Sequence, residues 1–123
     1  MQRITLVIGA SLNPLRHSYR TVSYLRSEGY PVAAIGPREG EIDGIQVQTG
    51  LPGLKRVHTV SLYLKPERQE PYIDYILSLH PRRIIFNKKT FNKALADKAL
   101  AEGIAVMEDC TLVMIAKGTY WGD

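Results

Sequence analysis

The chain has 123 residues, of which 45% are hydrophobic, so we expect one domain with one buried core over residues 1–123. Its formal net charge of +4 favours an anionic partner, although such a charge is also common on solvated surfaces. The apolar runs are too short for a membrane span or a signal peptide, and the single cysteine cannot form an internal disulfide. Together these features exclude a membrane protein and predict a cytoplasmic location.

The first 37 residues predict a β-α-β unit. Residues 3–8 form a short segment that is apolar nearly throughout and rich in β-branched side chains, which is typical of a parallel strand covered on both faces. Residues 18–28 carry apolar side chains at every third position, and Gly29 supplies a helix stop. Residues 32–35 form a second apolar run between prolines, and these exclude a helix there.

The middle of the chain predicts a small hairpin followed by a third strand. Residues 36–56 contain five glycines and two prolines, and the pair Asp43-Gly44 is a two-residue hairpin signal. We therefore expect a small surface hairpin there. Residues 57–64 alternate apolar and polar side chains, which predicts a third strand closed by Pro66.

The remaining elements continue the alternation of helices and strands. They are a helix over 72–79 with Pro71 in its first turn, a strand over 84–86, a helix over 94–100, a strand over 104–107, and a short helix over 112–115 before a tail over 118–123. This order predicts an α/β fold: a doubly wound sheet of about five parallel strands with helices on both faces, in three layers. The carboxyl ends of all these strands then lie along one edge.

The turn after the first strand is a candidate phosphate site. In open parallel sheets, ligands bind at the carboxyl edge where the strand order reverses. A turn of small residues lets backbone N–H groups and a helix N-terminus approach a diphosphate. Only one glycine of a G-x-G-x-x-G pattern is present, so an ordinary tight turn stays open as an alternative. The candidate residues here are Gly9, Ala10, Ser11, Asn13 and Ser18.

The loop after the second strand indicates which nucleotide fits. An NAD site normally carries Asp or Glu at this position to hold the ribose hydroxyls. Here Pro37 and Arg38 follow the strand instead. A cation favours a ribose phosphate, which coenzyme A carries on its 3′ oxygen and NADP on its 2′ oxygen. The alternative is that Arg38 is a solvated loop residue.

The later loops supply further candidates, and each has a structural alternative. Leu62 and Tyr63 lie at the end of the third strand, where they are candidate ligand neighbours. Asn87 and Lys88 follow the fourth strand; Lys88 would neutralise phosphate, whereas Asn87 would orient an amide or simply shape the turn. Cys110 follows the fifth strand and either faces the ligand or is a small packing residue. The three histidines lack metal-ligand spacing, so we expect no metal and assign no catalytic residue.

Several segments of the chain match one known group of proteins, in residues 9–14 with 18–19, 39–44, 62–67, 83–87 and 110–113. In these the chain resembles the small stand-alone coenzyme-A-binding Rossmann proteins, which are related to the coenzyme-A domains of succinyl-CoA synthetase α subunits. The resemblance covers nearly the whole chain. It implies a Rossmann fold, coenzyme A or an acyl-CoA as ligand, and an adenine nucleotide near Gly9, Ser11, Arg38, Leu62 and Tyr63.

The chain departs from the family pattern at two places. Gly36-Pro37 stands where the family usually shows Asn-Pro, and residues 88–92 replace a turn that usually contains Pro-Gly. The lost glycine removes a place for close backbone approach and bulky cations replace it, which predicts that the pantetheine end binds differently from the family pattern or not at all.

The leading functional hypothesis is a binding module without catalytic activity, acting as a sensor or beside a protein partner that carries catalytic domains. The resemblance implies that a complete ligase needs further domains, which 123 residues cannot hold. A second hypothesis is a small NADP-linked oxidoreductase; the sequence places no proton donor beside a hydride site, and Tyr63 stays open as a candidate. A third is a nucleotide-dependent regulator that contacts nucleic acid through Lys88, Lys89 and Lys93.

Overall fold

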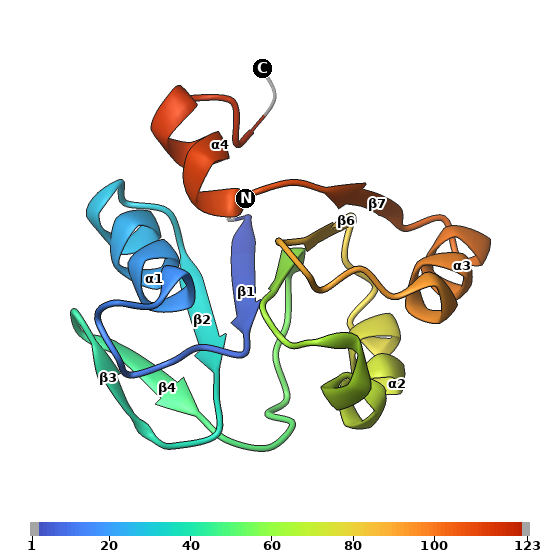
Figure 1. Cartoon of the computed structure of the whole chain (residues 1–123), viewed down its shortest axis with the longest axis horizontal. Coiled ribbons are helices and arrows are strands. Elements are labelled where there is room, and N and C mark those ends of the chain that lie inside the picture. The colour runs from blue at the N-terminus through green and yellow to red at the C-terminus, as the bar shows by residue number, and fades with distance from the viewer. Residues whose placement is uncertain (1–2, 122–123) are drawn as a thin grey trace.

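The chain folds around a single seven-stranded sheet in the order β3-β4-β2-β1-β5-β6-β7 (Figure 1). The structure, a computed structural model, describes residues 3–121. The strands are β1 (Ile4–Ile8), β2 (Val32–Ile35), β3 (Gly40–Ile42), β4 (Ile45–Gln48), β5 (Val57–Leu62), β6 (Arg83–Phe86) and β7 (Ala105–Glu108). The helices are α1 (His17–Ser27), α2 (Glu70–Ser78), α3 (Lys93–Ala101) and α4 (Thr111–Lys117), with a 3₁₀ turn, η1 (Pro66–Arg68).

Helices cover both faces of the sheet, which confirms the predicted doubly wound α/β fold. Figure 1 shows α1 and α4 on one side of the strands and α2 and α3 on the other. Leu6 of β1 packs in the core formed with α2 and α3, and Val7 packs in the core formed with α1 and α4. Both side chains are fully buried, and burial of each contributes about 1.5 to 3 kcal/mol.

The predicted surface hairpin extends this sheet, so two strands join the predicted set of about five at one edge. The turn at Asp43-Gly44 lies between β3 and β4, as predicted, and these two strands are antiparallel. However, β4 also pairs in parallel with β2, with Ala34 opposite Val47. The hairpin therefore completes the edge of the main sheet because backbone groups of β2 need a partner there.

Strand β5 is shorter than predicted and is buried on both faces. It ends at Leu62 rather than at residue 64. Its polar residues Thr59 and Ser61 are fully buried and hydrogen-bonded. Thr59 Oγ1 accepts a hydrogen bond from Arg83 Nε at 2.8 Å, and Ser61 Oγ lies 2.8 Å from Thr111 Oγ1. The polar positions face a helix layer, so periodicity alone could not reveal their burial.

The segment after α4 is fastened to the amino end of the sheet. Tyr120 is 1% exposed, and its hydroxyl lies 2.6 Å from Thr5 Oγ1 at the start of β1. Arg83 Nη2 donates to the carbonyl oxygen of Tyr120 at 2.7 Å. The predicted tail is thus ordered packing as far as Trp121, and its last two residues, 122–123, lie outside the described residues.

Candidate ligand-binding site

The strand order reverses between β1 and β5, because the chain passes from β1 to β2 on one side and later returns to β5 on the other. This is the position at which open α/β sheets bind ligands. The loops after β1 and β5 meet there at Gly9. A Cβ on Gly9 would lie 3.1 Å from the carbonyl carbon of Tyr63, and its φ of 94° is strained for other residues. A glycine is therefore required for this close approach.

Side-chain oxygens shape the turn after β1. The backbone N–H of Ser11 donates to Ser18 Oγ at 3.0 Å, and that of Asn13 donates to Ser11 Oγ at 3.0 Å. Asn13 Oδ1 accepts from the N–H of Leu15 at 3.0 Å. The N-cap of α1, Arg16, makes no side-chain capping bond, so the first amides of this helix stay available to an anion.

Two adjoining pockets lie against this turn and share Gly9 and Ser11. The pocket at the start of α1, here the helix pocket, has a volume of about 460 Å³. The pocket between the loops, here the loop pocket, has a volume of about 360 Å³. The helix pocket is lined by Gly9, Ser11, Leu15, Arg16, His17, Ser18 and Tyr63. The loop pocket is lined by Gly9, Ala10, Ser11, Leu12, Asn13, Pro37, Arg38, Leu64 and Arg68.

The structure brings eight of the twelve candidate residues to the walls of these two pockets: Gly9, Ala10, Ser11, Asn13, Ser18, Pro37, Arg38 and Tyr63. Leu62 does not line either pocket, because its side chain is fully buried in the core. Lys88 is exposed and Cys110 is half-buried at the N-cap of α4, and neither lines these pockets.

Asn87 has the structural role that the sequence left open as its alternative. Its side chain is 4% exposed. Its Nδ2 donates to Ser61 Oγ and to the Leu62 carbonyl, both at 3.0 Å, and its Oδ1 accepts from the N–H of Thr111 at 2.9 Å. The amide thus joins β5, the loop after β6 and α4. Its hydrogen-bonding groups are occupied within the protein.

Tyr63 lines the helix pocket, and its hydroxyl contacts α1. The hydroxyl lies 2.5 Å from Thr21 Oγ1 of α1. Burial raises the pKa of Tyr63 to about 12, with a smaller contribution from Cys110. A phenol with such a pKa stays protonated near neutral pH and is a weak proton donor, which disfavours the role that the oxidoreductase hypothesis gives it.

Sequence reasoning missed Arg68 and Leu64 in the loop pocket. Leu64 lies in the loop rather than at the end of the strand, because β5 ends at Leu62, and Arg68 belongs to η1, which begins at Pro66. Pro66 predicts a strand stop, but a proline is also typical of the first position of a helical turn. That second meaning was the available signal for Arg68 near the sheet edge.

Backbone packing explains why glycine stands at residue 36, where the family pattern usually shows asparagine. Gly36 is buried, and a Cβ built on it would lie 2.2 Å from the carbonyl oxygen of Ala10. The loops after β1 and β2 therefore touch through their backbones at this point. The absence of a side chain at Gly36 allows the close approach that forms one wall of the loop pocket.

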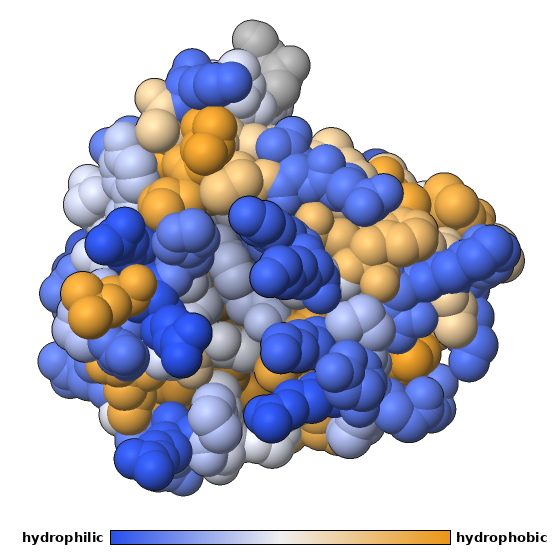
Figure 2. Space-filling view, viewed as in Figure 1, coloured by the Kyte–Doolittle hydropathy of each residue, from blue (hydrophilic) through white to orange (hydrophobic). Residues whose placement is uncertain are grey.

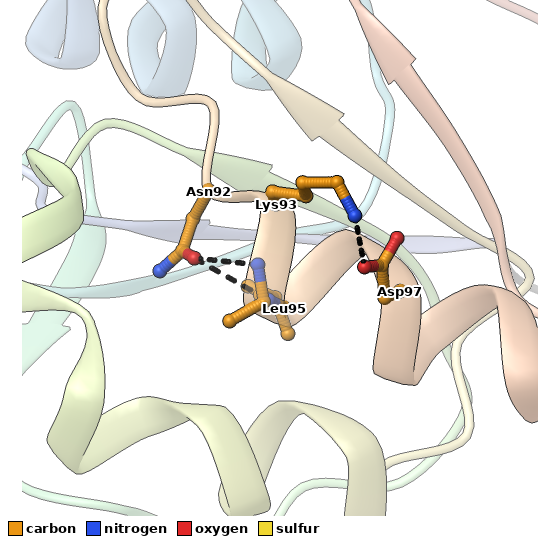
Figure 3. Close-up of polar contacts among 5 residues, drawn as sticks. Asn92, Lys93, Leu95 and Asp97 are labelled. Carbon is orange, nitrogen blue, oxygen red and sulfur yellow. Dashed lines mark hydrogen bonds and ion pairs between the residues drawn. The ribbon is translucent and has the colours of Figure 1, made fainter.

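Residues 88–92 form the second departure from the family pattern. One of them has the backbone conformation typical of glycine, and another caps a helix. Lys89 has a φ of 67°, a left-handed conformation that glycine adopts more readily. Asn92 Oδ1 accepts from the N–H groups of Ala94 and Leu95 at the start of α3 (Figure 3). Lys93 forms an exposed ion pair with Asp97 at 2.7 Å, so its charge is partly offset. Asn92 is therefore a cap rather than a free ligand group.

The surface, the ionisable groups and the helices add three observations. Figure 2 shows a mostly hydrophilic face with apolar side chains gathered over α4, where Val113 is 43% exposed. Among residues 3–121, His, Cys, Asp and Glu side chains form no group of three or more that could hold a metal ion. Within the same residues, no helix is long and apolar enough to cross a membrane.

The strand order and the pockets at its reversal are those of a Rossmann-like α/β domain. The chain belongs to the CoA binding domain family, whose sequence model matches residues 3–116. This confirms the resemblance seen in the sequence.

Solved structures share this fold. One, a crystal structure described only as an uncharacterized protein, is 36% identical with a TM-score of 0.91 and covers 97% of this chain and 98% of its own. A protein from Thermus thermophilus has a TM-score of 0.84 at 22% identity and covers 94% and 90%. A hypothetical protein from Pyrococcus horikoshii has a TM-score of 0.81 at 24% identity and covers 94% and 82%. No curated protein matches the chain.

Proposed function

We propose that this chain is a single domain that binds coenzyme A, free or acylated, at the carboxyl edge between β1 and β5. Family membership supports this ligand, and the two pockets at the strand reversal supply space for it. The observation that carries the proposal is Arg38 in the loop pocket. It stands just after β2, where an NAD site would carry an acid, and forms no ion pair within residues 3–121.

In the proposed mode, the adenosine end of coenzyme A occupies the loop pocket. Leu12 and Leu64 supply apolar surface there, and Arg38 supplies a cation for the 3′-phosphate. The diphosphate lies against the turn at Gly9 and the uncapped start of α1, where Arg16 adds positive charge. The pantetheine end continues past the ring of Tyr63 along the carboxyl edge.

We further propose that the domain binds its ligand without transforming it, as a sensor or as a subunit beside a catalytic partner. The engagement of the Tyr63 hydroxyl with Thr21 supports this role, because it withdraws the candidate proton donor from the pocket. Arg38 would also suit the 2′-phosphate of NADP, so NADP is the necessary comparison ligand.

The proposal predicts a preference for coenzyme A over dephospho-coenzyme A. In thermal and denaturant unfolding, coenzyme A should stabilise the chain more than dephospho-coenzyme A or NAD by about 1.5 to 3 kcal/mol, the worth of one charge-assisted contact. Arg38→Ala should remove most of this difference. Arg26→Ala is the matched control, because Arg26 is exposed on α1 and lines neither pocket. Greater stabilisation by NADP than by coenzyme A would instead favour the oxidoreductase hypothesis.

A further inference from the structure

A second arginine, Arg68, lines the loop pocket together with Arg38. Arg38 follows β2 and Arg68 belongs to η1, which follows β5. In the sheet, β1 lies between β2 and β5. The two arginines therefore come from the two sides of the turn after β1, and both line the same pocket of about 360 Å³.

Among residues 3–121, no acidic side chain lines this pocket. Glu39 and Glu67 are adjacent in sequence to the two arginines, yet neither arginine forms an ion pair in the described part of the chain. Two like charges bordering one pocket repel each other, and a bound anion removes this repulsion while gaining charge-assisted hydrogen bonds. A phosphate monoester suits such a pair because it carries about two negative charges near neutral pH, whereas each phosphate of a diphosphate bridge carries about one.

We infer that Arg68 is a second specificity-determining residue, which acts with Arg38 to select a nucleotide with a phosphate monoester on its adenosine ribose. The inference rests on the proposed binding of coenzyme A, and it adds that the selection needs both walls of the loop pocket. Apolar surface from Leu12 and Leu64 holds the base, so the arginines are left to recognise the phosphate. Discrimination by paired guanidinium groups is expected to exceed that of a single exposed cation.

The test is calorimetric titration of the full chain, freed of bound ligand, with coenzyme A and with dephospho-coenzyme A. Arg68→Ala should weaken coenzyme A binding about tenfold or more, while dephospho-coenzyme A binding changes less than about twofold. Lys65→Ala is the matched control, because Lys65 is an exposed cation of the same loop that does not line the loop pocket. It should leave both affinities within about twofold. Arg68→Lys should restore only part of the loss, since it keeps the charge but not the planar fork.

Two results would overturn the inference while leaving the proposed function intact. One is an Arg68→Ala variant that binds both ligands as the wild type does. The other is an equal loss of affinity for both ligands. That result would show that Arg68 attracts any anionic ligand through its charge and does not recognise the 3′-phosphate. Failure of the folded wild-type chain to bind coenzyme A at millimolar concentration would instead overturn the proposed function. Circular dichroism of each variant checks folding, which the exposed position of Arg68 should preserve.

Discussion

Replacing Gly36 by alanine is expected to lower the free energy of unfolding by about 3 kcal/mol and to abolish binding in the loop pocket. The new Cβ would lie 2.2 Å from the carbonyl oxygen of Ala10 and 3.2 Å from Val47 Cγ1. The oxygen cannot move alone, because the N–H groups of Gly9 and Ala10 both donate to the Ile35 carbonyl at 2.9 Å. The turn after β1 must shift as a unit, which displaces a wall of the pocket.

Gly53→Ala is the matched control for Gly36→Ala. A Cβ on Gly53 would meet no atom within 4 Å, and its backbone lies outside the left-handed region. This change should leave the stability unchanged or raise it slightly, because alanine restricts the unfolded chain. Urea unfolding of both variants measures the difference. Equal urea midpoints for the two variants would show that the close approach at Gly36 does not affect the free energy of unfolding.

Replacing Asn87 by aspartate is expected to cost about 3 to 5 kcal/mol above pH 7, because it places an unpaired charge in the core. The native Nδ2 donates to Ser61 Oγ and to the Leu62 carbonyl, and a carboxylate oxygen there would face the carbonyl without a proton. Burial and this contact should raise the pKa of the new carboxyl in the folded state above its unfolded value of about 3.9. The unfolded state then loses its proton first as the pH rises. The variant should therefore become progressively less stable above about pH 4.

The pH profile separates this effect from a simple packing defect. Unfolding at pH 5 and at pH 8 should show a larger deficit for Asn87→Asp at pH 8. Asn13→Asp is the control, because Asn13 is exposed and its Oδ1 only accepts a hydrogen bond, which a carboxylate can also accept. A deficit for Asn87→Asp that is the same at both pH values would contradict the assignment of Asn87 as a buried donor.

The alternation of strands and helices could be predicted from local patterns, whereas the sheet edge could not. Residues 32–35 are apolar throughout, residues 4–8 are apolar except for Thr5, and both segments end at turn residues, so their boundaries follow from composition. The turn at Asp43-Gly44 was also visible in the sequence. Whether its hairpin stands apart or joins β2 depends on the free backbone groups of that strand, which no local pattern encodes.

The candidate site was predictable where it depends on the turn after β1 and less so elsewhere. Gly9, Ser11 and Arg38 follow strand ends, and topology places strand ends at one edge. Asn87 also follows a strand end, yet its amide turns inward because Thr111 and Ser61 approach it from distant segments. Arg68 lines the loop pocket because it belongs to η1, the 3₁₀ turn that follows β5. The pattern of apolar residues does not predict this turn.

Native mass spectrometry of the purified full chain mixed with coenzyme A tests the central claim most directly. The account predicts one coenzyme A bound per chain, and predicts that any ligand that copurifies has the mass of coenzyme A or an acyl-CoA. A bound NADP, or a folded chain that binds no coenzyme A at millimolar concentration, would contradict it.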